Sequence, residues 1–91
     1  METKTLDKVT SGKKVKIIDF VFGRHSSYSQ KYAGDIPQFL IRLQEMGILK
    51  GEIITVERNN RSGPIEVTVK GTHLAIGRGI ASRVLVEEIN E

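Results

Sequence analysis

Residues 42–58 read R-L-Q-E-M-G-I-L-K-G-E-I-I-T-V-E-R. A helical pattern stops at Gly47, a second glycine follows at Gly51, and a run of β-branched residues begins directly after it. Glycine adopts positive φ without the steric penalty that a Cβ atom brings, so both glycines suit tight turns. The stretch therefore predicts a short helix that gives way to a β-strand within a few residues.

The residues before Gly47 carry the signals of a helix start and of one apolar helical face. Asp35 is a favourable N-cap residue, Gln38 stands at the capping-box spacing from it, and Pro37 falls in the first turn, where its missing N–H costs nothing. The apolar residues that share one face are Phe39, Leu40, Leu43 and Met46. We expect a helix over about residues 36–46 that packs this face into the core.

The rest of the chain predicts short strands separated by turns. β-branched and aromatic residues concentrate in five segments, residues 14–22, 52–59, 65–70, 73–77 and 84–89. Short strands with glycine-rich turns favour a small closed barrel, which removes exposed sheet edges. We therefore expect a mainly β fold, a small barrel of five short strands with one short inserted helix.

The connections between these segments differ in kind. Residues 23–35 are polar and serine-rich, without a helical or strand period, and they predict a long loop. Gly71-Thr72 matches a two-residue hairpin of type II′, with glycine first. Residues 77–83 are long enough for one helical turn. In the first strand, alternation places Val15 and Ile17 on the face opposite to that of Phe20.

Composition limits the classes of protein to which the chain can belong. The 91 residues are 38% hydrophobic and 27% charged, which is typical of one globular domain, residues 1–91. The chain has no cysteine, so disulfides and thiolate metal sites are excluded. Its N-terminus has no apolar signal region, and no apolar run approaches the roughly 20 residues that span a bilayer. We expect a cytoplasmic protein without direct membrane insertion.

Four stretches in the second half resemble the FeoA family, the small accessory proteins of bacterial ferrous iron uptake. These stretches are residues 42–56, G-P-I-E-V-T-V-K-G at 63–71, H-L-A-I-G-R-G-I-A at 73–81, and V-L-V-E at 84–87. Residues 6–20 are similar to the family's opening leucine, glycine and first strand, so the resemblance covers roughly residues 6–22 and 38–89. It implies an SH3-like barrel, which agrees with the strands predicted above. The departure is the segment 23–37, which is longer than the family's usual loop.

The resemblance also implies a role and a partner. FeoA proteins act beside FeoB, the ferrous iron transporter of the membrane, which carries a cytosolic GTPase domain. We expect a non-enzymatic accessory protein that docks on FeoB, in the cytoplasm or peripherally at the inner face of the membrane. Activation, assembly and regulation of the transporter all remain open, as does the oligomeric state.

The implied cargo is ferrous iron, which accepts histidine and carboxylate ligands. The candidates are His25, His73, Glu66, Asp19 and Asp35. The two histidines lie far apart, and no pair of ligands has the spacing of a helical metal motif. We expect no cofactor, and at most a weak contact with Fe²⁺ or another divalent metal.

Catalysis and nucleic-acid binding are two alternative functions for the chain. Ser26, Ser27 and Ser29 lie near His25, but the sequence offers no fixed base and no orienting group, so we expect no enzyme. A small basic barrel could bind nucleic acid if Phe20 and Phe22 stacked on bases beside basic residues of the first strand. We expect these phenylalanines in the core instead. Protein binding remains, and the candidate contacts are Arg24, Tyr28, Tyr32, Arg78 and Ile80.

Overall fold

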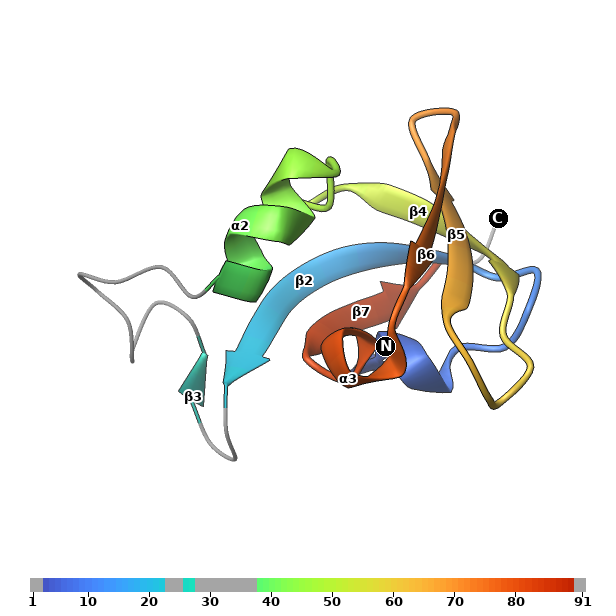
Figure 1. Cartoon of the computed structure of the whole chain (residues 1–91), viewed down its shortest axis with the longest axis horizontal. Helices are drawn as coiled ribbons and strands as arrows, with labels where there is room; N and C mark the ends of the chain where they lie inside the picture. The colour runs from blue at the N-terminus through green and yellow to red at the C-terminus, as the bar shows by residue number, and fades with distance from the viewer. Residues whose placement is uncertain (1–2, 23–25, 28–37, 90–91) are drawn as a thin grey trace.

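The computed structural model describes residues 3–22, 26–27 and 38–89, in which short strands dominate (Figure 1). In chain order its elements are β1 (Thr3–Thr5), the 3₁₀ turn η1 (Leu6–Lys8), β2 (Lys14–Phe22), β3 (Ser26–Ser27), α2 (Gln38–Glu45), β4 (Ile53–Arg58), β5 (Ile65–Val69), β6 (Thr72–Ile76), α3 (Arg78–Ala81) and β7 (Val84–Glu88). The five predicted strands correspond to β2, β4, β5, β6 and β7, and the predicted helix corresponds to α2. The sequence patterns missed β1, and they missed β3, the two-residue strand within the segment 23–35 that is predicted as a long loop.

The strands form one antiparallel sheet in the order β1-β7-β2-β4-β5-β6, with β3 pairing to the end of β2. The long second strand is shared: Lys14–Lys16 pair with β4, and residues from Val15 to Phe20 pair with β7. Figure 1 shows β2 curving across the molecule, with α2 above it and the β5–β6 hairpin standing to one side. The mainly β class with one inserted helix is therefore confirmed.

A β-bulge at Ile18 explains why the first predicted strand is apolar on both faces. Ile17 lies opposite Val86 and Asp19 lies opposite Leu85, so one extra residue separates the two pairs on β2. The extra residue restarts the alternation, and a bulge also bends its strand. Ile17 and Phe20 are consequently both buried, which corrects the prediction that they lie on opposite faces.

The end of α2 follows from Gly47, as the opening stretch predicts. Gly47 has a φ of 88°, and its N–H donates to the carbonyl of Gln44 at 3.0 Å. The next N–H, that of Ile48, donates back to the carbonyl of Leu43 at 2.8 Å. This pair of bonds is the Schellman motif, in which the residue after the glycine packs against the last helical turn. Leu43 and Ile48 are both fully buried, so the motif fastens the helix end to the core.

The chain then turns into β4 over only four residues. Gly51 has a φ of 87° at the third position of a turn, in which the N–H of Glu52 donates to the carbonyl of Leu49 at 3.1 Å. A type II turn requires this positive φ. The N–H of Gly51 also donates to the carbonyl of Ile17 at 2.8 Å, so the connection joins β2 before β4 begins.

The hairpin between β5 and β6 is displaced by one residue from its prediction. Val69 lies opposite Thr72, so the two loop residues are Lys70 and Gly71. Their φ values are 51° and 80°. Positive φ at both positions defines type I′, whose twist matches that of the flanking strands. The predicted type II′ turn at Gly71-Thr72 is therefore wrong.

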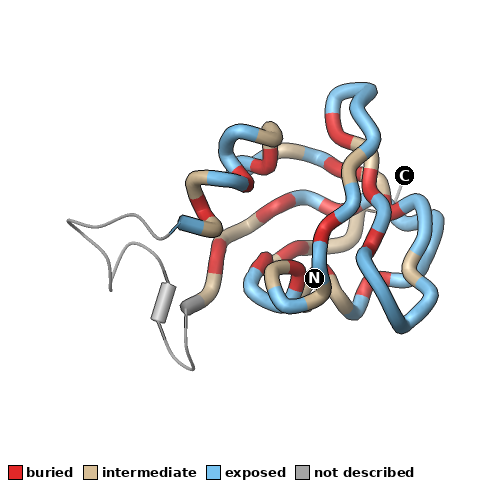
Figure 2. Tube along the Cα trace, in the orientation of Figure 1, coloured by how far each residue is buried: buried red, intermediate tan, exposed pale blue. Residues whose placement is uncertain are grey.

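One apolar core runs through the barrel and under α2, and Figure 2 shows its buried positions alternating along the strands. Along β5 the predicted alternation is confirmed, with Ile65, Val67 and Val69 buried. The other buried residues are Leu6, Val9, Val15, Ile17, Phe20, Leu40, Leu43, Ile48, Ile54, Val56, Ile76, Ala81, Val84 and Val86. Phe39 and Met46 pack at the edge of this core, which confirms the predicted face of α2.

We predict that Gly51→Ala lowers the free energy of unfolding by about 1–2 kcal/mol, because alanine is strained at positive φ. The matched control is Gly79→Ala. Gly79 lies in α3 without positive φ, and a Cβ there would meet no atom within 4 Å. Alanine at this helical position should be neutral or stabilise by up to about 1 kcal/mol. Urea unfolding measures both variants, and equal effects would contradict the role of Gly51.

Candidate partner-binding site

An apolar groove of about 330 Å³ lies between the C-terminal half of α2 and the segment that joins β6 to α3. Its lining residues are Arg42, Glu45, Met46, Ala75, Ile76, Gly77 and Ile80. Ile76 is buried at the base, whereas Met46 and Ile80 are half-buried. Arg42 and Glu45 are exposed and add one charge of each sign to the rim. The groove therefore offers an apolar base with polar, hydrated margins.

Helical spacing brings the α2 residues of the groove together. Residues three and four positions apart share one side of a helix, and Arg42, Glu45 and Met46 have this spacing. The guanidinium of Arg83 lies over the ring of Phe39, 5.2 Å from the ring centroid. Such a cation–π contact contributes about 0.5–1 kcal/mol at an exposed site. It ties α2 to the residues after α3, so the two walls of the groove are held in place.

The strand at the groove, β6, is the last strand in the sheet order. Its only strand neighbour among the described residues is β5. The second edge of β6 thus carries backbone N–H and C=O groups without a strand partner, and such edges readily accept a strand from another chain. The groove and this free edge together form one continuous candidate surface.

A second apolar depression lies on the other side of α2. Its lining includes Phe20, Leu40 and Leu49, with Gln44 and Lys50 at its margin. Leu49 is 38% exposed, and Ile53 at the start of β4 is 51% exposed. The groove beside β6 adjoins the edge of the last strand in the sheet order, so we take it as the better candidate.

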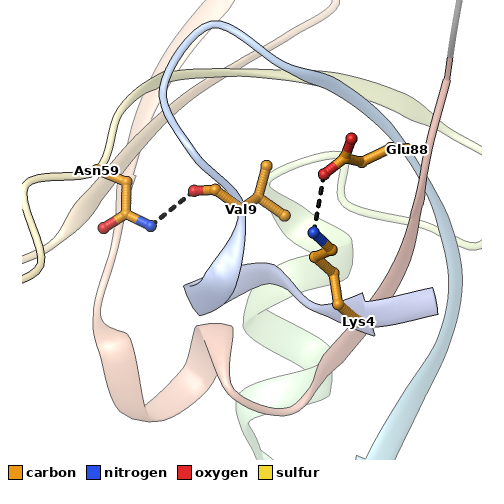
Figure 3. A network of polar contacts seen from close by, with 4 residues as sticks. All are labelled: Lys4, Val9, Asn59 and Glu88. Carbon is orange, nitrogen blue, oxygen red and sulfur yellow. Dashed lines mark hydrogen bonds and ion pairs between the residues drawn. The ribbon is translucent and has the colours of Figure 1, made fainter. Parts of the chain in front are cut away.

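Polar side chains close the barrel between its two end strands. The side-chain amide of Asn59 donates to the carbonyl of Val9 at 2.7 Å, as Figure 3 shows. It also donates to the carbonyl of Asp7 at 3.0 Å. The same amide accepts from Arg78 Nη1 at 2.9 Å and from the N–H of Arg61 at 3.2 Å. Both N–H donors and both acceptor positions of the Asn59 amide are therefore in use.

Arg78 completes this closure from α3. Its guanidinium donates to the carbonyl of Asp7 at 3.1 Å and to that of Gly63 at 3.3 Å, in addition to Asn59. The candidate contact Arg78 is thus half-buried in a network, whereas the candidate Ile80 lines the groove. The other candidates, Arg24, Tyr28 and Tyr32, lie outside the described residues.

The metal candidates do not converge in the described part of the chain. His73 and Glu66 are both exposed, and they sit diagonally on β6 and β5, since His73 faces Thr68 while Glu66 faces Ala75. Asp19 is paired with Lys50 at 3.2 Å. His25 and Asp35 lie outside the described residues. Over residues 3–22, 26–27 and 38–89, no group of three or more potential ligands could hold a metal ion.

The remaining features concern nucleic acid and the membrane. Phe20 is only 4% exposed, so it packs in the core and cannot stack on a base. The side chain of Phe22 lies outside the description. Of the helices in the described ranges, none reaches the length and apolarity that a membrane crossing requires.

Comparison with known proteins identifies the family. The FeoA domain model matches residues 4–88. The chain belongs to the FeoA domain family. A protein of Methanocaldococcus jannaschii, provisionally named Fe(2+) transport protein A, is 45% identical over 47 residues, which cover 52% of this chain and 56% of that protein. The match therefore spans about half the length of this relative.

Two solved FeoA structures share the fold. A crystal structure of an iron uptake regulatory protein, FeoA, is 26% identical, with a TM-score of 0.74 and coverage of 98% of this chain and 100% of that chain. The zinc complex of FeoA from Stenotrophomonas maltophilia is also 26% identical, with a TM-score of 0.61 and coverage of 91% and 88%. That FeoA is described as an SH3 domain protein, so the predicted SH3-like barrel and FeoA resemblance are confirmed.

The sequence patterns did not predict most of the groove residues, and they did not predict the hydrogen bonds of Asn59 and Arg78 that close the barrel. Arg42, Glu45 and Met46 have a recognisable helical spacing, but nothing in the sequence places β6 beside them. Asn59 stands in a turn-like cluster, and its bonds reach residues 50 and 52 positions away along the chain. No local pattern predicts contacts at that separation.

We predict that Asn59→Ala destabilises the fold by about 1–3 kcal/mol, because partly buried donors and acceptors lose their partners. Its neighbour Asn60 is exposed, and Asn60→Ala should change the free energy of unfolding by less than about 0.5 kcal/mol. Chemical denaturation of both variants measures the difference. If both substitutions change the free energy of unfolding by a similarly small amount, the hydrogen bonds of Asn59 contribute little to stability.

An ion pair between β1 and β7 gives a second, pH-dependent prediction. Lys4 Nζ donates to Glu88 Oε2 at 2.9 Å (Figure 3), and this bond lowers the pKa of Glu88 below its ordinary value of 4.5. The unfolded chain therefore binds a proton here at higher pH than the folded protein does. The stabilisation is fully present above pH 4.5 and is lost as the pH falls through the lowered pKa.

Unfolding measured from pH 7 to pH 3 for the native chain and Glu88→Gln tests this linkage. The free energy of unfolding of the native chain should exceed that of Glu88→Gln by a constant amount near neutral pH. This difference should shrink below pH 4.5. Lys4→Met should weaken the same pH dependence because it removes the donor. If the difference in free energy of unfolding between the native chain and Glu88→Gln is unchanged at pH 3, the ion pair of Lys4 and Glu88 is not its source.

Proposed function

We propose that this chain is a non-enzymatic accessory protein of ferrous iron uptake that docks on the cytosolic face of a FeoB-like transporter. The observation that carries the proposal is an apolar groove beside the free edge of β6, in a chain of the FeoA domain family. In this proposal the protein works as a single domain by binding. It catalyses no reaction and holds no resident cofactor.

The names of similar proteins support the link to iron. The relative from Methanocaldococcus jannaschii carries Fe(2+) transport in its name, and the Stenotrophomonas maltophilia FeoA is suggested to be a ferrous iron transport activating factor. Both describe proteins that serve transport. Membership of the FeoA domain family is consistent with such an auxiliary role on the cytosolic side of a membrane.

The geometry of the groove supports a protein partner. A partner segment in extended conformation could pair with the free edge of β6 and insert an apolar side chain against Met46, Ile76 and Ile80. Strand addition of this kind takes its affinity from backbone hydrogen bonds and its specificity from side-chain pockets. Arg42 and Glu45 at the rim would orient the segment by charge. We place the FeoB contact here.

We predict that Ala75→Arg weakens binding to the cytosolic domain of FeoB by at least about tenfold, a loss of about 1.4 kcal/mol. Ala75 is exposed on β6 and lines the groove, so arginine would obstruct the groove without entering the core. The matched control is Thr72→Arg, an exposed position on the same strand that is not part of the groove lining.

A pull-down and a titration with the purified FeoB domain, with GTP, with GDP and without nucleotide, measure both variants. Thr72→Arg should bind within about twofold of the native chain. Equal binding of Ala75→Arg would move the contact away from the groove. Absence of native binding in every nucleotide state would overturn the proposed partner.

A further inference from the structure

A polar cavity of about 480 Å³ lies on the other side of the barrel closure. It is bounded by η1, by the residues that follow η1, by the loop after β4, and by the start of α3. Its lining residues are Asp7, Lys8, Val9, Thr10, Ser11, Asn59, Arg61 and Arg78. Residues from three separate segments, 7–11, the loop after β4 and the start of α3, thus converge on one space, which the proposed docking at the groove does not use.

The cavity has an excess of positive charge. Lys8, Arg61 and Arg78 contribute three cations, while Asp7 contributes the one carboxylate, so the formal charge of the lining is +2. The carboxylate of Asp7 accepts a hydrogen bond from the hydroxyl of Thr5. Among the described residues, Lys4, Lys50 and Lys70 form ion pairs away from the cavity, whereas the hydrogen bonds of Arg78 go to neutral oxygens.

Arg78 has N–H donors that can still bond to a ligand oxygen. Its three hydrogen bonds go to neutral oxygens: the side-chain oxygen of Asn59 and the backbone carbonyls of Gly63 and Asp7. A guanidinium has five N–H donors, so two of them have no acceptor among the described residues. None of these bonds goes to a charged oxygen, and a bound anion would give the half-buried guanidinium a charged acceptor.

The other lining groups also provide donors. The Oγ of Ser11 accepts from the N–H of Asn59 at 2.8 Å, which leaves its hydroxyl hydrogen free to donate. Lys8 and Arg61 are exposed at the cavity margin and bring an ammonium and a second guanidinium. Among the described residues, the lining of the cavity therefore has many donors, two arginine side chains and one acidic side chain.

The backbone at Arg61 is consistent with a specific requirement for this side chain. Its φ is 72°, a conformation that costs a residue with a Cβ about 1–2 kcal/mol. Glycine or asparagine would adopt it more readily. Arginine is nevertheless present at this strained position, and it supplies a charge to the cavity.

We propose that this cavity binds the phosphate group of a small molecule or of inorganic phosphate. Guanidinium groups form paired hydrogen bonds with phosphate oxygens, and an ammonium adds a point charge. Arg78 supplies the inner contact, already oriented by its bonds to Asn59 and Asp7, while Lys8 and Arg61 close over the anion. A nucleic-acid strand fits less well, because the lining has no aromatic side chain on which a base could stack.

The test is an NMR titration of the whole chain with inorganic phosphate, pyrophosphate and glycerol 3-phosphate at constant ionic strength. The amides of Lys8, Ser11 and Arg61 should shift and reach saturation. Arg61→Gln should raise the Kd at least fivefold, and Lys8→Gln/Arg61→Gln at least tenfold. Arg58→Gln, which removes the same charge from an exposed position outside the cavity, should change the Kd by less than twofold.

The results of the titration distinguish a phosphorylated small molecule from inorganic phosphate as the ligand, and they can also overturn the proposed site. Tighter binding of glycerol 3-phosphate identifies a phosphorylated small molecule, and tighter binding of the inorganic ions identifies those ions; both support the site. Shifts that do not saturate, or equal weakening by Arg58→Gln, would show charge screening only and overturn it. Single-stranded RNA that displaces pyrophosphate and binds more tightly than any small phosphate would make a nucleic-acid strand the ligand and would also overturn it. FeoB is absent throughout, so failure here leaves the docking proposal unaffected.

Discussion

The fold depends on a closure made by side chains rather than by strand pairing. The strands at the two ends of the sheet order, β1 and β6, do not pair with each other. Asn59 and Arg78 join the segments between them through hydrogen bonds to the backbone of Asp7, Val9 and Gly63. Because one asparagine amide uses all its donors and acceptors at once, a small barrel is closed without extending its sheet.

Both candidate sites follow from this way of closing. Since β6 has only one strand neighbour among the described residues, its second edge stays available beside the groove. The short helix α3 then separates two surfaces of different character. Arg78 lies in the basic cavity and Ile80 lies in the apolar groove, two positions apart in the same helix. A partner segment and a small anion would thus bind on opposite sides of the short helix α3.

The sequence predicted those features that local chemistry determines. Gly47 and Gly51 ended the helix and opened β4 because only a residue without Cβ takes positive φ freely. The alternation in β5 identified its buried face. The bulge at Ile18 and the I′ turn at Lys70 escaped prediction because sheet pairing decides both. Strands as short as β1 and β3 show no period, and the groove and the closure join segments that are distant in the chain.

The central claim is that the open edge of β6 and its groove form the docking surface. An NMR titration of the isotope-labelled chain with the unlabelled cytosolic domain of FeoB tests it directly. We predict that the largest amide shifts fall on the C-terminal half of α2, on β6 around Ala75 and on α3 around Ile80. Shifts concentrated on the outer face of β2 and β7, with the groove unchanged, would contradict the account.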